Sequence, residues 1–355
     1  MDKILVVNPF GAGDVLFSTP VVRALKQRYP DSFIGYLCNR EVEALLKENP
    51  AIDELFFYTR GDFKKIRRKS YIRYVKTFFK ALNTLRARKF DLVVDLSLVN
   101  QYSFIFWLIG IKKRFGFDYK KRGRFLTDKI LVNSFKHKHV VKFYRDLLFK
   151  LGISDFKEET QLFLADFNKQ WGDSFWEKQN LADGQLLVGL AAFGGASWGQ
   201  NAASKQWPLE RFARVAKRII ERYQAKIIIF GTAQDKESGN TLEKAIDDEN
   251  VINVTGQTTL GQLAALISRL NIFIGNDSGP LHIACALKIK TISIFGPVDH
   301  RVYGPVGDRQ HNVMLYKDIN CRPCYKNFKT PDCKTMNCLL AISENDVWKA
   351  VETLL

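Results

Sequence analysis

The chain has 355 residues, which is enough for two domains with separate cores, and 46% of them are hydrophobic, which excludes a disordered protein. No run of about 18 apolar residues occurs, so a membrane-spanning helix is not expected. The formal net charge of +17 lies entirely in the first half, because residues 1–150 contain 31 Lys and Arg against 14 Asp and Glu. We therefore expect the N-terminal half to meet something anionic, which from the charge alone can be nucleic acid, a membrane surface or a phosphorylated substrate. A solvated basic face without a partner is the alternative.

The first residues lead directly into an apolar run, so we expect no signal peptide and a cytoplasmic protein. Apolar runs along the first half predict buried strands at residues 3–7, 33–37, 54–58 and 91–96. Helical spacing predicts helices at residues 15–29, 41–47, 71–88, 102–109 and 140–150. Residues 112–117 are interpreted as a basic strand or sheet edge, and residues 120–124 as a basic loop.

The second half repeats this alternation. Strands are predicted at residues 186–191, 226–230, 251–254, 272–274 and 291–295, and helices at 209–223, 236–246, 259–268 and 343–355. Alternating strands and helices indicate an α/β protein with parallel sheets, in which ligands bind at the carboxyl ends of the strands. We expect an N-terminal domain at 1–165, a C-terminal domain at 180–340, and a final helix at 341–355 that packs back on the N-terminal domain.

The stretch 272–287 reads as a short buried strand, a polar turn and an apolar helix. Asp277 or Ser278 can cap this helix, and Pro280 fits its first turn. A helix N-terminus at a strand end favours an anion such as phosphate. An ordinary connection between a strand and a helix is the alternative at this point.

Three further side chains follow strands in the same way. Asp14 follows the first strand, where a carboxylate can accept a proton from an attacking hydroxyl or simply cap a helix. Lys205 follows a glycine-rich turn and suits a diphosphate, although a lone surface lysine is the usual case. Glu237 follows the turn at 231–233. It can accept hydrogen bonds from a ribose diol, or it can be an ordinary acidic residue that stabilises the first turn of a helix.

Four motifs occur in an order that resembles the bacterial lipopolysaccharide heptosyltransferases of glycosyltransferase family 9, especially heptosyltransferase II. They are Gly-Ala-Gly-Asp-Val at 11–15, Lys-Gln-Trp-Pro at 205–208, Phe-Gly-Thr-Ala at 230–233 with Asp235 and Glu237, and Asn-Asp-Ser-Gly-Pro-Leu-His at 276–282. The resemblance spans nearly the whole chain. It implies a GT-B fold, in which two Rossmann-like domains with parallel sheets face a central cleft.

The resemblance also implies an inverting transfer of heptose from ADP-L-glycero-D-manno-heptose to the phosphorylated inner core of lipopolysaccharide on lipid A, with no cofactor and no catalytic metal. The C-terminal domain would bind the donor and the N-terminal domain the acceptor. Asp14 matches the catalytic base, Lys205 the diphosphate-binding lysine and Glu237 the ribose ligand. Asp277, Ser278 and Gly279 match the loop at the donor phosphates, with Asp277 orienting its N–H groups, and His282 matches a residue that orients the helix or touches the sugar.

An acceptor with carboxylates and phosphates on an anionic membrane explains the basic N-terminal half. We expect peripheral contact with the inner face of the inner membrane, without insertion, by a monomer that binds no nucleic acid. The residues predicted to bind the acceptor or the membrane are Lys64, Lys65, Arg67, Arg68, Lys69, Arg73, Lys120, Lys121, Arg122 and Arg124.

Cys321, Cys324, Cys333 and Cys338 follow a C-x2-C-x8-C-x4-C spacing, which in a cytoplasmic protein suggests structural zinc more than disulfides. Free thiols or redox-labile pairs are the alternative.

Three other functions remain open from the sequence. One is transfer of another nucleotide-activated sugar in core or O-antigen assembly. A second is RNA binding, suggested by the charge but opposed by the neutral second half. A third is a GT-B epimerase, in which the basic half would lack a purpose.

Overall fold

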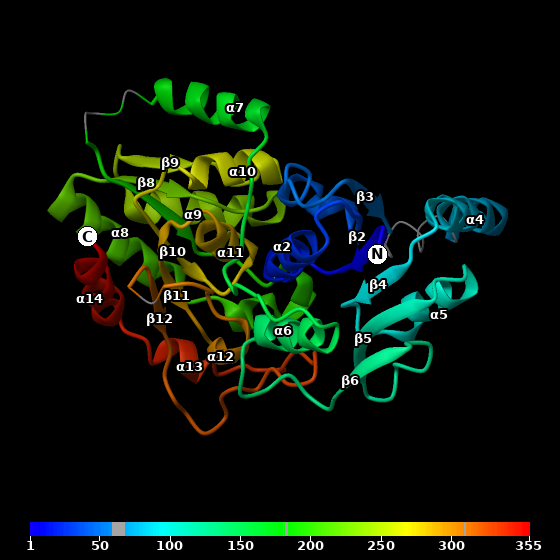
Figure 1. The fold of residues 1–355 in the computed structure, drawn as a ribbon. Coiled ribbons are helices and arrows are strands. Elements are labelled where there is room, and N and C mark those ends of the chain that lie inside the picture. Colours follow the sequence, from blue (N-terminus) through cyan, green and yellow to red (C-terminus); the bar gives the residue numbers. More distant parts are fainter. Residues whose placement is uncertain (59–67, 180, 182–183, 309) are drawn as a thin grey trace. The chain divides into compact units, whose positions relative to one another are not determined.

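The computed structural model describes residues 1–58, 68–179, 181, 184–308 and 310–355. They form two compact units, Met1–Phe163 and Leu164–Leu355. Among the described residues, each unit has one parallel sheet of six strands with helices packed on it (Figure 1). The predicted α/β class with two parallel sheets is therefore confirmed.

The first sheet has the strand order β3-β2-β1-β4-β5-β6. Its strands are β1 (Lys3–Val7), β2 (Phe33–Cys38), β3 (Glu54–Phe57), β4 (Leu92–Asp95), β5 (Lys113–Tyr119) and β6 (Asp128–Val132). Val7 at the end of β1 pairs with Leu37 on one side and Asp95 on the other. The central strands are continuous apolar runs because helices cover both of their faces.

The helices of the first unit are α1 (Ala12–Phe17), α2 (Thr19–Arg28), the 3-10 helix η1 (Arg40–Leu45), α4 (Tyr71–Arg88), α5 (Asn100–Leu108) and α6 (Val140–Lys150). The single helix predicted at 15–29 is wrong in one respect, because it divides at Ser18. The Ser18 hydroxyl donates to the Val15 carbonyl at 2.7 Å and lies 2.6 Å from the Tyr36 hydroxyl. These bonds satisfy polar groups that the break leaves inside the core.

The second sheet has the order β12-β11-β10-β7-β8-β9. Its strands are β7 (Leu187–Ala191), β8 (Lys226–Ile229), β9 (Val251–Asn253), β10 (Ile272–Asn276), β11 (Lys290–Ile294) and β12 (Asn312–Leu315). The helices are α7 (Asp166–Glu177), η2 (Ala196–Lys205), α8 (Leu209–Tyr223), η3 (Ala233–Asp235), α9 (Lys236–Ile246), α10 (Leu260–Ile267), α11 (Gly279–Ala286), α12 (His300–Tyr303), α13 (Asn337–Leu340) and α14 (Glu344–Leu354).

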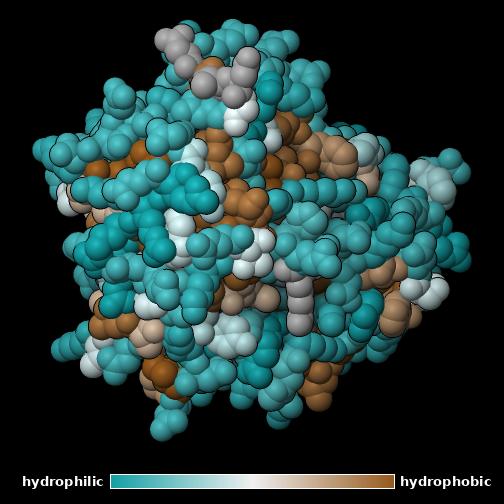
Figure 2. Space-filling view, turned by 90° about the vertical axis from the view of Figure 1, so that its left-hand side faces the viewer, coloured by the Kyte–Doolittle hydropathy of each residue, from teal (hydrophilic) through white to brown (hydrophobic). Residues whose placement is uncertain are grey.

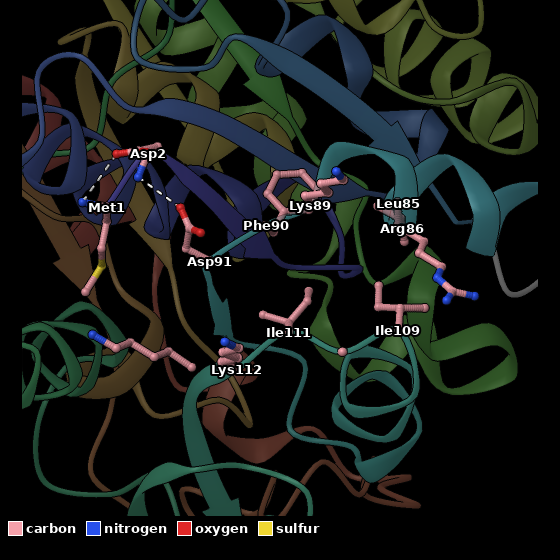
Figure 3. Close-up of a pocket in the computed structure, with 12 residues that line it drawn as sticks. Met1, Asp2, Leu85, Arg86, Lys89, Phe90, Asp91, Ile109, Ile111 and Lys112 are labelled. Atoms are coloured by element: carbon pink, nitrogen blue, oxygen red, sulfur yellow. Dashed lines mark hydrogen bonds and ion pairs between the residues drawn. The ribbon is translucent and has the colours of Figure 1, made fainter.

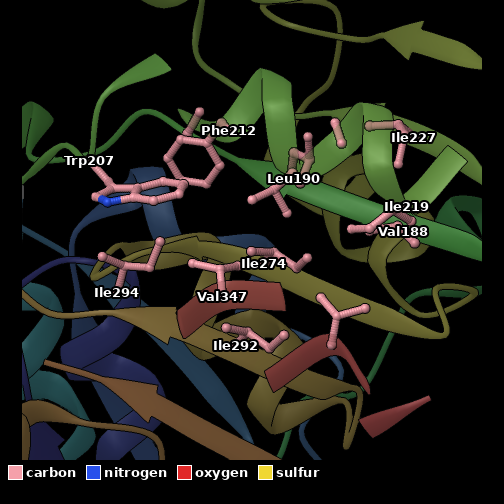
Figure 4. Close-up of a cluster of buried hydrophobic side chains, with 14 of the residues drawn as sticks. Val188, Leu190, Trp207, Phe212, Ile219, Ile227, Ile274, Ile292, Ile294 and Val347 are labelled. Atoms are coloured by element: carbon pink, nitrogen blue, oxygen red, sulfur yellow. The ribbon is translucent and has the colours of Figure 1, made fainter. Parts of the chain in front are cut away.

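The core of the second unit joins side chains of β7, β10 and β11 to those of α8 and α14 (Figure 4). The C-terminal helix α14 contributes Val347, Trp348 and Val351 to it. Arg214 of α8 also donates to the Glu344 carboxylate at 2.6 Å. The final helix, expected to pack back on the N-terminal domain, thus belongs to the second unit, because its apolar face completes that core.

The face of the molecule that carries α8 and α14 is mostly hydrophilic, with hydrophobic residues gathered in a band across its upper half (Figure 2). Within the described ranges, no helix is both long and apolar enough to cross a bilayer.

Candidate active site

The strand order of the second sheet reverses at β7. The chain first adds β8 and β9 on one side of β7, and then adds β10, β11 and β12 on the other side. The carboxyl ends at such a switch point diverge and leave room for a ligand. The loop after β7 comes close to the loop after β10 here, because a Cβ added to Gly194 would lie 3.3 Å from the Cβ of Ser278. Gly195 has a φ of +75°, which glycine adopts without strain.

Asn276, the last residue of β10, connects three segments of this site. It is fully buried, and its amide Nδ2 donates to the Ala192 carbonyl at 2.6 Å. Its Oδ1 accepts from the backbone N–H of Trp207 at 3.0 Å. Asn276 therefore fixes the glycine-rich loop and the Lys-Gln-Trp-Pro segment to the end of β10.

Lys205 and Asp277 form a buried ion pair. The ammonium lies 2.6 Å from Oδ2 of Asp277, with the two side chains 12% and 8% exposed. Burial acts to raise the pKa of Asp277, but Lys205 and His282 outweigh it and lower this pKa to about 2. Nε2 of His282 lies 3.8 Å from Oδ1 of the same carboxylate. Asp277 is therefore an anion that the Lys205 ammonium holds in place, with His282 beside it.

Aromatic rings flank this lysine. The Lys205 ammonium lies 4.9 Å from the centroid of Trp198, and Trp198 stacks on Tyr325 with ring centroids 4.9 Å apart. A ring face attracts a cation, so Trp198 adds a second favourable contact to the lysine.

Ser278 is the N-cap of α11, yet its side chain makes no capping hydrogen bond. Its Oγ is buried and has no hydrogen-bond partner in the described structure. Gly279 opens the helix, whose first N–H groups and dipole favour an anion. Lys205, Ser278 and this helix start together form a site suited to a diphosphate.

Glu237 lies on the exposed first turn of α9. It follows β8, which neighbours β7 in the sheet, so the residue sits one strand along the same edge. The turn before it is held by Thr232 and Asp235, since the Asp235 carboxylate accepts from the Thr232 N–H at 2.8 Å and from its hydroxyl at 2.6 Å.

The first sheet has its own switch point between β1 and β4. Asp14 lies in the first turn of α1, directly after β1, and its backbone carbonyl accepts from Asn8 Nδ2 at 2.9 Å. Asp95 ends β4, is 4% exposed, and accepts from the Ser97 N–H at 2.9 Å. Burial raises the pKa of Asp95 to about 6, although the Ser97 bonds oppose the shift. Asp14, the predicted base, and Asp95, a second carboxylic acid, thus follow or end two neighbouring strands at the same edge of the sheet.

The predicted basic residues lie on separate elements of the first unit. Arg68, Lys69 and Arg73 are exposed at or before the start of α4, and Ser70 caps that helix by accepting from the Arg73 N–H. The basic residues at 120, 121, 122 and 124 are exposed in the connection between β5 and β6. Lys64, Lys65 and Arg67 lie outside the described residues.

A pocket of about 650 Å³ lies at the opposite, amino edge of the first sheet (Figure 3). Asp2 and Asp91 line it near the starts of β1 and β4, together with Arg86, Lys89 and Lys112. The Asp91 carboxylate is already occupied, because it accepts from the Asp2 N–H at 3.0 Å. The residues given for the lining of this pocket include none of the predicted site residues.

No disulfide joins the four cysteines that are predicted to bind zinc. Across the ranges that the structure describes, no group of three or more His, Cys, Asp or Glu side chains is arranged to hold a metal ion. The four thiols nevertheless lie near one another, because burial and then the charges of Cys324, Cys321 and Cys333 raise the pKa of Cys338. Zinc binding by these four cysteines therefore stays a prediction.

Sequence reasoning missed the connecting role of Asn276 and the aromatic pair beside Lys205. The position of Asn276 as the last residue of a buried strand is a usable signal, because a buried amide needs several partners. Tyr325 gives no such signal, since it lies 120 residues beyond Lys205 in the sequence.

Comparisons with known proteins agree with this geometry. A family model described as glycosyltransferase family 9 (heptosyltransferase) matches residues 78–334. Lipopolysaccharide heptosyltransferase 3 of Escherichia coli K12 is 27% identical over 82% of both chains, and lipopolysaccharide heptosyltransferase 2 of the same strain is 26% identical over 88% of both. The solved structure of the E. coli ADP-heptose lipopolysaccharide heptosyltransferase II matches with a TM-score of 0.74 and 22% identity, covering 99% of this chain and 98% of that one. This likeness confirms the predicted GT-B fold.

Proposed function

The chain belongs to glycosyltransferase family 9, the heptosyltransferase family, and we propose that it transfers heptose from ADP-L-glycero-D-manno-heptose to the inner core of lipopolysaccharide. The observation that carries the proposal is the group at the switch point of the second sheet. There, the Lys205 ammonium, the unpartnered Ser278 hydroxyl and the start of α11 offer a diphosphate both charge and hydrogen bonds. Two relatives that match over most of the chain are named lipopolysaccharide heptosyltransferases, which supports the choice of donor and acceptor.

The donor role divides among residues of the second unit. Lys205, Ser278 and Gly279 bind the diphosphate of ADP, and Asp277 and His282 hold the lysine and the loop. Glu237 accepts hydrogen bonds from the ribose diol. The exposure of Glu237 suits this role, because its carboxylate is open to a ligand at the same sheet edge.

The chemistry is a direct displacement with inversion. The Asp14 carboxylate takes the proton from an acceptor hydroxyl, whose oxygen forms a bond to the anomeric carbon of heptose. The bond from that carbon to the phosphate oxygen breaks, and its electron pair leaves on ADP. Lys205 and the α11 N-terminus stabilise the charge that develops on the departing diphosphate.

The first unit binds the acceptor and meets the membrane from the cytoplasmic side. Arg68, Lys69, Arg73 and the basic residues of the connection between β5 and β6 are exposed cations suited to the carboxylates and phosphates of the acceptor. The same charges favour an anionic membrane surface, so we propose peripheral association with the inner membrane.

Calorimetric titration with ADP, UDP, GDP and CMP tests the donor site. We expect selective binding of ADP and a loss of roughly tenfold or more in affinity for Lys205→Ala, because a charge-assisted contact to phosphate disappears. Lys217→Ala removes an exposed lysine on α8 and is the matched control. A preference for UDP or GDP would contradict the heptose donor while leaving a sugar transferase, and no nucleotide binding would overturn the proposed function.

A further inference from the structure

Helix α5 of the first unit exposes an apolar face. Its nine residues include no charged side chain. Phe104, Trp107 and Leu108 are 41%, 50% and 53% exposed, and their i, i+3 and i+4 spacing places them on one side of the helix. Tyr102 and Phe106 are buried on the other side. The helix therefore packs with one face and presents large apolar side chains with the other.

Phe125 extends this face from a different segment. Its ring centroid lies 5.0 Å from that of Phe104 and 5.6 Å from that of Trp107. Arg114 fixes the segment in place, since its Nε donates to the Phe125 carbonyl at 2.5 Å and its Nη1 to the Ile111 carbonyl. We call Phe104, Trp107, Leu108 and Phe125 the aromatic patch. Ring contacts join the three aromatic side chains, and Leu108 lies one helical turn beyond Phe104 on the same helix.

Basic residues lie next to the aromatic patch in space or in sequence. Lys112 and Lys113 are exposed just after α5, and the Arg124 guanidinium lies 5.8 Å from the centroid of Phe125. The neighbouring helix α4 shares a core cluster with α5 through Leu85. It contains no Asp or Glu and exposes Ile72 by 70%.

We propose that the aromatic patch inserts into the headgroup region of an anionic bilayer, while the neighbouring Lys and Arg side chains bind the lipid phosphates. Charge favours a membrane over a second copy of this chain as the partner, because the cations beside the exposed rings attract an anionic surface and repel another basic chain. Nine residues are too few to cross a bilayer, so the helix lies at the interface.

This inference rests on the proposed function, since a lipid-linked acceptor requires the enzyme to work at the membrane. Helix α5 begins at Asn100, shortly after the carboxyl end of β4, and Asp14 follows the carboxyl end of the adjacent strand β1. The helix then runs back toward the amino edge, where the parallel strand β5 begins, so Trp107 and Leu108 lie toward the edge opposite the one that carries Asp14.

The test is binding of the full-length protein to sedimented vesicles of phosphatidylglycerol and phosphatidylcholine, at low and at high salt. Salt screens the basic residues but leaves hydrophobic insertion, so we expect wild type to retain binding at high salt. At high salt, the double variant Phe104→Ser/Trp107→Ser should partition into the vesicles roughly tenfold more weakly than wild type. The reason is that it lacks the two half-exposed rings that wild type buries in the bilayer. Phe167→Ser is the matched control, since Phe167 is 64% exposed on α7 of the second unit.

Fluorescence gives a second readout that does not depend on a folded double variant. Brominated lipids should quench wild type more strongly than Trp107→Phe, because Trp107 is the indole placed in the bilayer. Equal quenching, equal partitioning of the double variant and wild type, or loss of all wild-type binding at high salt would each overturn the proposal. So would a dimer in solution that the double variant converts to a monomer. ADP binding and transfer to a water-soluble acceptor fragment report separately on the proposed function, and we expect the double variant to retain both.

Discussion

Replacing Asp277 by Asn should destabilise the protein in a way that depends on pH. The carboxylate is buried with the Lys205 ammonium 2.6 Å away, and its pKa falls from 3.8 to about 2 although burial alone would raise it. A pKa difference of nearly two units between the unfolded and folded states corresponds to about 2 kcal/mol of folding free energy. We expect Asp277→Asn to lose at least this much at neutral pH, since it also leaves the buried lysine without its counter-ion.

The sign follows from the direction of the shift. The folded pKa lies below the unfolded pKa, so the ionised carboxylate contributes its full stability above about pH 4. That contribution is lost as the pH falls from about 4 to about 2, where wild-type Asp277 takes up its proton. The free energies of unfolding of wild type and variant should therefore converge in acid.

Urea unfolding of the full chain at a series of pH values measures this difference directly. Asp166→Asn is the matched control, because Asp166 pairs with Lys169 at 2.9 Å on an exposed surface of the same unit. Its substitution should leave the urea midpoint nearly unchanged. A wild-type-like midpoint for Asp277→Asn at neutral pH, or a gap that stays constant down to pH 2, would refute the reasoning.

Three further predictions concern the two sheet edges. Asp14→Asn should lower the transfer rate by about 10²–10⁴-fold and leave calorimetric ADP binding unchanged; equal rates would remove Asp14 as the base. Asn276→Ala should lower the free energy of unfolding by about 2–4 kcal/mol in urea, because the Ala192 carbonyl and the Trp207 N–H lose their partner, whereas a change within error would contradict these bonds. Asp95→Asn should stabilise the protein above about pH 6 by roughly 3 kcal/mol and make little difference near pH 4, because burial raises the pKa of Asp95 to about 6; the opposite trend in urea unfolding would refute this assignment.

The central strands could be predicted because burial on both faces imposes an unbroken apolar run. Strand β1 matches its predicted bounds, and Ile4 to Val7 are fully buried. The edge strands β6 and β12 bury only part of their side chains and are not predicted, although the equally exposed edge strands β3 and β9 are. Helix α7 was missed as well, since it follows the first unit directly and its Phe167 is exposed. A short, partly buried element carries few apolar residues, so its pattern supports a prediction in some cases and not in others.

The candidate site could be predicted in outline, because each of its residues follows a strand and parallel strands bring their carboxyl ends to one edge. This logic brings Asp277 and Ser278 beside the loop after β7. It does not reveal that Trp198 and Tyr325 stack beside Lys205, because that contact depends on how two long connections fold over the edge. Neither the connection that contains Trp198 nor the one that contains Tyr325 has a periodic apolar pattern from which its conformation could be predicted.

Asp277 shows why a carboxylate can belong to a site for an anion. From the sequence we expected it to orient the N–H groups of its loop, but in the structure it holds the Lys205 ammonium while its own N–H donates to the Ile294 carbonyl at 3.2 Å. A lysine that is already fixed loses little conformational freedom when a diphosphate binds, so less of the interaction energy is spent on ordering it. The compact ammonium can donate to a carboxylate and a phosphate in different directions. The N–H donors of a guanidinium all lie in one plane, so an arginine would not reach both groups with the same geometry. Lys205→Arg should therefore keep the charge and still weaken ADP binding in calorimetry, and an affinity equal to wild type would show that charge alone accounts for the site.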